Sequence, residues 1–186
     1  MSWYGSNREE FQASVRKLGL PFEFFPALPV AGESMHAADF FLKQAGCEGP
    51  AVPRIDCPRD CRRDFVAIHP FSGSARKNWP LERYQELAGR LEWPVEWCVE
   101  LDGAVRILDL YELACWLATA RMYIGNDSGI THLAAAVGVP VVAIFGPTDP
   151  AVWSPRGASV RVVSGNLEAI TVEQVSEVTV TSGTLN

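Results

Sequence analysis

The sequence has few basic residues, few cysteines and no long apolar run. Its 186 residues include 16 Lys and Arg against 22 Asp and Glu, which gives a net charge of −6. This balance argues against a nucleic acid partner, because phosphate backbones are bound by clustered basic side chains. No stretch approaches the length of a membrane-spanning helix, and the first residues lack the basic and then apolar order of a signal peptide. We therefore expect a cytoplasmic protein.

The five cysteines are odd in number and have no secretory context, so free thiols are expected. The nearest approach to a zinc site is formed by Cys57 and Cys61, with Cys47 and His36 upstream. Their spacing does not match the common zinc patterns, and no second ligand pair follows. We therefore expect no metal.

The most informative stretch covers residues 122–155. Residues 122–124 form a short apolar run that predicts a buried strand, and residues 126–129 follow with turn and helix-cap chemistry. A helix is predicted next, because apolar residues recur on one helical face at Ile130, Leu133, Ala134 and Val137. Gly138 ends this helix, and residues 141–145 predict a second buried strand. Such a unit is typical of a parallel sheet.

Polar and small residues gather at the start of this helix, namely Asp127, Ser128, Gly129 and, about one turn further on, His132. The unpaired N–H groups and the positive dipole end of a helix start favour an anion. Taken singly, Asp127 or Ser128 has the simpler interpretation of a helix cap, and His132 that of a surface residue. Together they indicate an anion-binding site.

A second polar loop, residues 69–80, follows the strand predicted at residues 65–68. It contains Ser72, Ser74 and Lys77, which offer the hydroxyl groups and positive charge that bind a diphosphate. The alternative for this loop alone is a solvated basic segment.

Strand and helix patterns alternate through the rest of the chain and predict an α/β fold, a parallel sheet with helices on both faces. Further strands are predicted at residues 95–99, 105–108 and 159–163, and further helices at residues 8–18, 34–45, 81–91, 111–120 and from 171 onward. Their start signals are Ser34, Pro80 as a first helical residue, Asp109, and a capping box between Thr171 and Gln174.

We expect two parts, a helical and linker segment at residues 1–63 and the α/β domain at residues 64–186. The first part includes an aromatic strip, residues 21–26, which is a candidate contact surface. The alternative is that this strip packs within its own domain.

Residues 125–155, GNDSGITHLAAAVGVPVVAIFGPTDPAVWSP, closely resemble the donor-binding motif of the family 9 glycosyltransferases, the bacterial lipopolysaccharide heptosyltransferases. The loop at residues 69–80 is similar to the family's HPG loop, which has a lysine and ends in Trp-Pro. The resemblance implies the Rossmann-like C-terminal half of a GT-B fold, which holds an ADP-sugar. It also implies that Lys77 meets the donor phosphates and that Ser72 contacts a phosphate or a sugar hydroxyl.

For the nucleoside, the resemblance implies that residues 108–110 border the adenine. It also implies an acidic contact to the ribose, for which Glu100 and Asp102 are candidates; their alternative is solvated surface.

The resemblance implies transfer of a sugar, heptose, from an ADP-sugar to a lipopolysaccharide core acceptor at the inner membrane surface, without a metal or cofactor. Lys77 would stabilise the leaving diphosphate. The family's acceptor domain and its general base have no counterpart here, so no catalytic base is assigned, and a separate acceptor-domain chain or a homo-oligomer is a possible partner. The alternatives are a non-catalytic nucleotide-sugar-binding module and an assembly partner of a complete glycosyltransferase.

Overall fold

The computed structural model describes residue 3 and residues 8–29, 35–58, 63–98 and 105–182. The chain divides into two compact units, Met1–Ala51 and Val52–Asn186. The second unit therefore begins before the Asp64 expected from the sequence. Ile55 and Cys57 pack against its core, and the Ile55 amide donates to the Ala136 carbonyl at 2.9 Å.

The first unit contains two helices, α1 (Glu9–Lys17) and α2 (Ala37–Gln44), as predicted. The chain leaves α1 through Gly19, whose φ of 63° is accessible to glycine at little cost. The cap predicted at Ser34 lies outside the described residues; His36 Nδ1 accepts from the Ala38 amide at 3.1 Å and caps α2.

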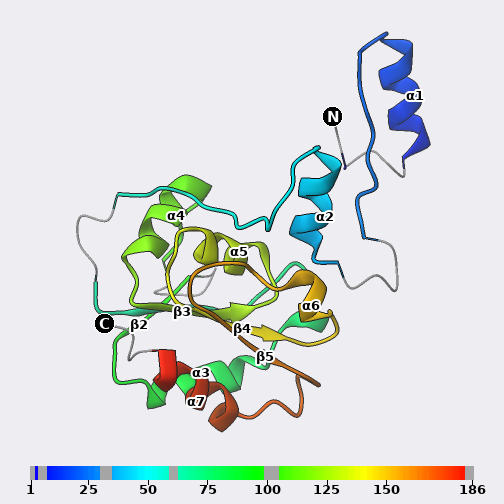
Figure 1. The fold of residues 1–186 in the computed structure, drawn as a ribbon. Helices are drawn as coiled ribbons and strands as arrows, with labels where there is room; N and C mark the ends of the chain where they lie inside the picture. The colour runs from blue at the N-terminus through cyan, green and yellow to red at the C-terminus, as the bar shows by residue number, and fades with distance from the viewer. Residues whose placement is uncertain (1–2, 4–7, 30–34, 59–62, 99–104, 183–186) are drawn as a thin grey trace. The chain divides into compact units, whose positions relative to one another are not determined.

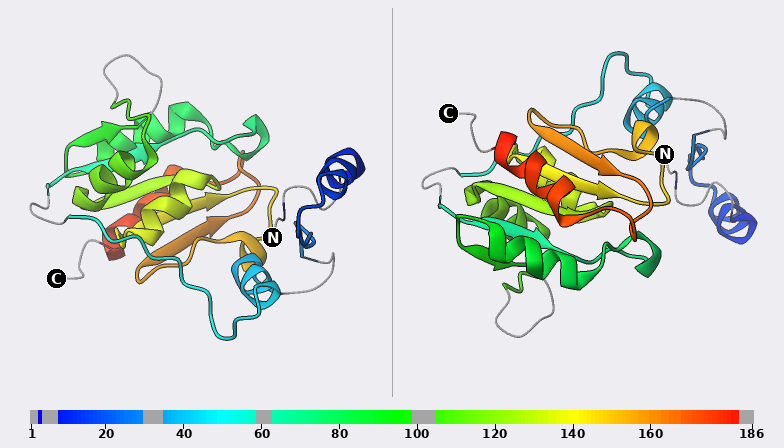
Figure 2. Two further views of the ribbon diagram at one scale, coloured as in Figure 1. Left: turned by 90° about the horizontal axis from the view of Figure 1, so that it is seen from above. Right: turned by 90° about the horizontal axis from the view of Figure 1, so that it is seen from below.

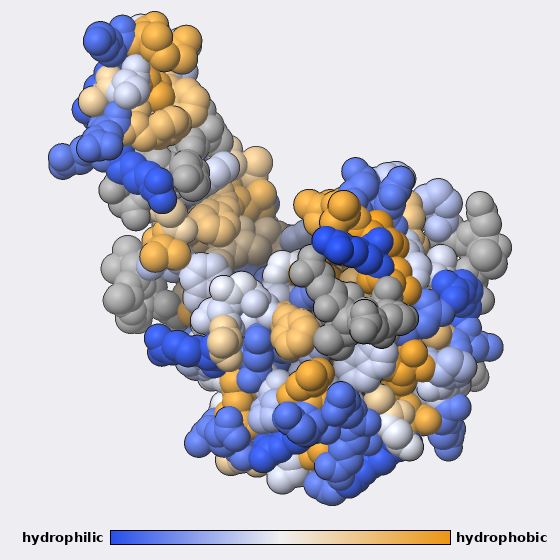
Figure 3. Space-filling view, turned by 180° about the vertical axis from the view of Figure 1, so that it is seen from behind, coloured by the Kyte–Doolittle hydropathy of each residue, from blue (hydrophilic) through white to orange (hydrophobic). Residues whose placement is uncertain are grey.

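Aromatic side chains of residues 21–26 pack within this first unit. Phe11 of α1 meets Phe22 and Phe24 with ring centroids 6.4 and 6.0 Å apart. Other apolar side chains remain exposed, including Leu18, Leu20 and Leu28, and Figure 3 shows the hydrophobic patches of this unit's surface. The strip is thus partly packed on its own unit.

The second unit is built on a five-stranded sheet with the order β2-β1-β3-β4-β5, in which all neighbours are parallel (Figure 1). This confirms the predicted parallel α/β fold. The strands are β1 (Val66–His69), β2 (Val95–Trp97), β3 (Met122–Asn126), β4 (Val141–Phe145) and β5 (Val160–Ser164).

Helices cover both faces of this sheet (Figure 2). One face packs against α4 (Leu110–Thr119) and α5 (Gly129–Ala136), and the other against α3 (Leu81–Arg90) and α7 (Val172–Ser182). Alternate residues of β3 serve the two cores, because successive strand side chains point to opposite faces. Tyr123 lies in the first core, and Met122 and Ile124 lie in the second.

Two predicted helix starts are confirmed in atomic detail. The Asp109 carboxylate accepts from the Tyr111 and Glu112 amides, each at 2.9 Å. Thr171 and Gln174 form the predicted capping box: each side chain accepts from the other residue's amide, at 3.3 and 2.9 Å.

Two local predictions are wrong. Residues 105–108 do not form a strand, because β2 offers them only the bond from the Val105 amide to the Trp97 carbonyl, and Leu108 is 83% exposed. Pro80 is the N-cap of α3 rather than its first helical residue. By contrast, the apolar face predicted for α5 is confirmed: Ala134 and Val137 are buried in one core, and Ile130 and Leu133 pack against that core.

Among the described residues, no helix combines the length and apolar character needed to cross a membrane. Cys61, Glu100 and Asp102 lie outside the described residues. The described part of the chain contains no group of three or more side chains that could hold a metal ion.

Candidate functional site

The carboxyl ends of three neighbouring strands, β1, β3 and β4, meet at one edge of the sheet. Their register places His69 opposite Gly125 and Asn126 opposite Ile144, so the loops that follow begin side by side. Ligands of open parallel sheets bind at this edge. The loop after β1 contains a short 3₁₀ helix, η1 (Ala75–Lys77), and the loop after β4 leads into α6 (Pro150–Trp153).

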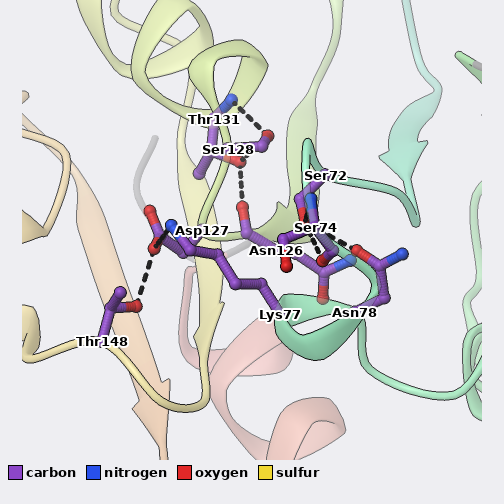
Figure 4. Close-up of polar contacts among 9 residues, drawn as sticks. All are labelled: Ser72, Ser74, Lys77, Asn78, Asn126, Asp127, Ser128, Thr131 and Thr148. Atoms are coloured by element: carbon purple, nitrogen blue, oxygen red, sulfur yellow. Dashed lines mark hydrogen bonds and ion pairs between the residues drawn. The ribbon is translucent and has the colours of Figure 1, made fainter.

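One carboxylate joins the three loops (Figure 4). The Lys77 ammonium donates to Asp127 Oδ2 at 2.7 Å, and the Thr148 hydroxyl donates to the same oxygen at 2.7 Å. The Asp127 side chain is 8% exposed and that of Lys77 is 32% exposed. The structure therefore brings Lys77 directly to the start of α5, as convergence of the two predicted loops requires.

The start of α5 lies next to this ion pair. Ser128 is its N-cap, and its hydroxyl accepts from the Thr131 amide at 3.4 Å. The amides of Gly129 and Ile130 are the first of the helix and have no carbonyl partner within it. Amides at a helix start can donate to an anion. His132 lies one turn further on and is partly buried.

The serines predicted to bind the donor shape their own loop. The Ser72 hydroxyl lies 2.8 Å from the Ser74 carbonyl and 2.7 Å from Asn78 Oδ1. It also accepts from the Ser74 amide at 3.3 Å. These contacts hold residues 72–78 in one turn before Trp79.

The sequence interpretation did not identify the role of Asn126 in positioning the loop after β1. Its side chain is fully buried, and Oδ1 accepts from the Trp79 amide and from the Tyr84 hydroxyl, each at 2.9 Å. Its Nδ2 donates to the Pro70 carbonyl at 2.6 Å. Asn126 thus fixes both ends of the loop that carries Lys77. A polar residue at the end of an apolar strand was the available signal, since buried amides need partners.

A second buried contact supports the start of α5. The Tyr123 hydroxyl lies 3.1 Å from Thr131 Oγ1, which lies 3.1 Å from the Ser128 hydroxyl and donates to the Asn126 carbonyl. Burial raises the pKa of Tyr123, so this hydroxyl stays protonated. Gly125 is required here, because a Cβ would lie 2.4 Å from the Tyr123 oxygen.

His69 ends β1 beneath the same edge. Burial lowers the pKa of His69 below its ordinary value of 6.5, and a hydrogen bond with the Phe71 backbone opposes this shift. Its Nδ1 is buried and has no hydrogen-bond partner among the described residues. Burial thus disfavours a charged imidazole, whereas Arg76 and Lys77 of η1 bring positive charge to this edge.

Sequence comparison identifies related proteins. The sequence model described as "Glycosyltransferase family 9 (heptosyltransferase)" matches residues 95–180. The chain is 35% identical over 75 residues to lipooligosaccharide heptosyltransferase 2 of Haemophilus influenzae, covering 39% of this chain and 21% of that protein. It is 38% identical over 86 residues to lipopolysaccharide heptosyltransferase 1 of Pseudomonas aeruginosa, covering 46% and 23%.

Solved structures show the same fold. "E. coli heptosyltransferase WaaC with ADP" superposes with a TM-score of 0.63 at 21% identity, covering 76% of this chain and 54% of that chain. A family 9 glycosyl transferase from Veillonella parvula gives a TM-score of 0.65 at 22% identity, covering 89% and 64%. The chain thus spans less than two thirds of the length of each of these relatives. Residues 95–180 are thus similar in sequence to glycosyltransferase family 9, and the chain shares the fold of these solved structures.

Proposed function

We propose that the second unit binds the diphosphate of an ADP-sugar at the edge formed by Lys77, Asp127 and the start of α5. In this proposal the chain takes part in transferring heptose to a lipopolysaccharide core acceptor. The similar proteins from Haemophilus and Pseudomonas are heptosyltransferases, and one similar structure contains ADP. A lipid acceptor would bring the chain to the cytoplasmic surface of the inner membrane.

The observation that carries the proposal is the 2.7 Å contact between Lys77 Nζ and Asp127 Oδ2. It brings the positive charge of one loop to the helix start that follows another. Both features stabilise an anion, and Asp127, the partner of Lys77, lies two residues before the first residue of α5. A departing diphosphate is the group that such an arrangement stabilises in sugar transfer.

The side chains divide the work. An ammonium has three N–H donors, so Lys77 can keep its bond to Asp127 and still donate to phosphate oxygens. Asp127 holds Lys77 in place and is itself held by Thr148. The amides at Gly129 and Ile130 supply further donors, and Ser72, Ser74 and His132 complete the proposed donor contacts. No metal ion is needed to neutralise the diphosphate in this proposal.

Thermal unfolding with ADP tests the donor site. We expect ADP to raise the melting temperature of the chain, because a ligand bound only by the folded state stabilises it. Lys77→Ala should abolish the shift, whereas the neighbouring Arg76→Ala should preserve it. AMP, which lacks the diphosphate, should give a smaller shift than ADP. An unchanged melting curve at saturating ADP-heptose would contradict the proposal.

A second candidate function is nucleotide-sugar binding without turnover. It is favoured by the state of Asp127, the carboxylate at this edge, which is already bound to Lys77 and Thr148 and is poorly placed to act as a base. A turnover assay with ADP-heptose and a lipopolysaccharide acceptor separates the two functions. Turnover by the chain alone supports the first. Turnover that requires an added acceptor-domain chain identifies this chain as the donor-binding partner.

A further inference from the structure

A separate hollow of about 480 Å³ lies between η1 and the loops that follow β4 and β5. We call it the Arg76 hollow; its polar lining includes Arg76, Asn78, Asn166 and Glu168, and Gly146 and Leu167 also line it. Lys77 and Asp127 are not part of the lining. Sites for small molecules have volumes of about 300–1,000 Å³, so this hollow is large enough for a monosaccharide.

The wall formed by residues 166–170 is held rigidly from below. The Arg83 guanidinium donates to the carbonyls of Leu167 at 3.1 Å, of Glu168 at 2.8 Å and of Ile170. The Trp79 indole also donates to the Ile170 carbonyl, at 3.0 Å. The carbonyls of Leu167, Glu168 and Ile170 therefore already accept hydrogen bonds from the protein without a ligand.

The opposite wall is equally fixed. The Lys77 amide donates to the Ser74 carbonyl at 2.9 Å, and Asn78 Oδ1 lies 2.7 Å from the Ser72 hydroxyl. Leu167 packs so closely on Gly146 that a Cβ there would lie 2.6 Å from its side chain. In Figure 4, Lys77 extends toward Asp127 while Asn78 lies on the other side of the η1 turn. Lys77 and Asn78 thus lie on different sides of one loop.

The polar side chains of the lining have unused hydrogen-bonding groups. Within the described part of the chain, neither the Arg76 guanidinium nor the Glu168 carboxylate has a side-chain partner. The Nδ2 groups of Asn78 and Asn166 are likewise unpaired with any described residue, since only the Oδ1 atoms of these amides are engaged.

These groups define the chemistry of a ligand. A guanidinium matches a carboxylate or phosphate with two parallel hydrogen bonds. Two amide donors and one carboxylate acceptor suit several hydroxyl groups. Among the described residues that line the hollow, none has an aromatic ring that would stack on a base or an apolar group.

We propose that the Arg76 hollow binds an anionic sugar, with the carboxylate or phosphate on Arg76 and the hydroxyls on Asn78, Asn166 and Glu168. In terms of the proposed function, on which this assignment rests, the ligand is a saccharide of the acceptor held beside the donor diphosphate. The site needs no contact with the nucleotide, so it can be tested separately from the donor site.

Amide NMR of the full chain, titrated with glucuronate, glucose 6-phosphate and glucose, tests the proposal. The two anions should shift the Gly165 and Asn166 signals saturably, and glucose should bind about tenfold more weakly or worse because it lacks the charge that Arg76 recognises. A preference between the two anions identifies carboxylate or phosphate as the recognised group.

Two adjacent variants give a matched comparison. Arg76→Gln should lower the affinity for the anionic sugar about fivefold or more and preserve the ADP-induced rise in melting temperature. Lys77→Gln should abolish the ADP-induced rise and preserve the affinity for the sugar. Arg54→Gln, which alters an exposed arginine outside the hollow, is the control for net charge. Melting temperatures show whether each variant is folded.

The proposal is overturned if neither anion binds, if glucose binds equally well, or if Lys77→Gln rather than Arg76→Gln removes binding. Sugar binding through Arg76 without any ADP binding would support the hollow and contradict the donor site. ADP binding through Lys77 without sugar binding would support the donor site and contradict the proposed role of the hollow.

Discussion

Asn126 and Asp127 are consecutive residues at the end of β3, yet their side chains have different kinds of partners. Asn126 is fully buried, and its three hydrogen bonds end on protein groups that no solvent reaches. Asp127 is also buried, at 7% exposed, but its partners Lys77 and Thr148 are partly exposed, so we call this pair of contacts the rim. The first residue fixes the loop, and the second holds a charge that a ligand can share.

This difference shows how the site separates stability from binding. Buried polar groups cost a great deal when they lose a partner, so the layer below the rim is the rigid one. A partly exposed ion pair contributes less, so it can be rearranged by a ligand without unfolding the chain. Variants below the rim should therefore change stability most, and variants at the rim should change binding most.

The largest effect is expected for Asn126→Leu. The change leaves the Trp79 amide, the Tyr84 hydroxyl and the Pro70 carbonyl without partners, and it should lower the free energy of unfolding by about 3 kcal/mol or more. Urea denaturation measures this. Asn166→Ala removes one exposed turn contact and should cost less than about 1 kcal/mol. Equal effects of the two variants would contradict the layered arrangement.

Lys77→Gln should affect binding rather than stability. We expect ADP affinity to fall about tenfold or more, or ~1.4 kcal/mol, because the charge opposite the diphosphate is lost. The free energy of unfolding should fall by less than about 2 kcal/mol, because Thr148 and the start of α5 still hold Asp127. Calorimetric titration and urea denaturation of the same variant provide the two numbers. If the Lys77→Gln variant is unstable but binds ADP normally, Lys77 contributes to stability rather than to binding, which contradicts this expectation.

Asp127→Asn should have a smaller effect on ADP. The amide oxygen can still accept from Lys77 and Thr148, and a negative charge beside the phosphates is removed. We therefore expect ADP affinity within about threefold of the unmodified chain, or tighter. If calorimetry shows a loss as large as that of Lys77→Gln, Asp127 is itself a donor contact rather than a positioning residue.

The smallest effect is expected for the pH dependence of stability that arises from His69. Because burial lowers the pKa of His69 in the folded state, the unfolded chain binds a proton more readily. The stability contribution of neutral His69 should be complete above pH 6.5 and should decrease as the pH falls through that value toward the folded-state pKa. Urea denaturation between about pH 7.5 and 5 should show a weaker pH dependence for His69→Gln. An NMR titration midpoint of His69 above 6.5 contradicts this account.

Local and topological features of this chain could be predicted from its sequence. A helix cap such as Asp109 accepts from backbone amides within three residues of itself, so its partners can be predicted from the local sequence. The meeting of Lys77 with the start of α5 was also predictable, because parallel strands end at one edge of a sheet. The donor roles of all the predicted site residues stay predictions; these residues are Ser72, Ser74, Lys77, Asp127, Ser128, Gly129 and His132.

Features that depend on distant packing could not be predicted. The partners of Asn126 lie 42 to 56 positions away, and its complete burial follows from how α3 covers the sheet. The Arg76 hollow needs residues 165–168, which only the loop after β5 brings to η1. Residues 105–108 have the composition of a strand, yet among the described residues their backbone bond to the edge strand β2 is limited to that from the Val105 amide to the Trp97 carbonyl.

The most direct test of the central claim is a crystal structure of the chain with ADP bound. We expect the diphosphate over Gly129, with phosphate oxygens within hydrogen-bond distance of Lys77 Nζ and of the first amides of α5. ADP bound elsewhere, with the contact between Lys77 and Asp127 intact and no anion at the helix start, would contradict it.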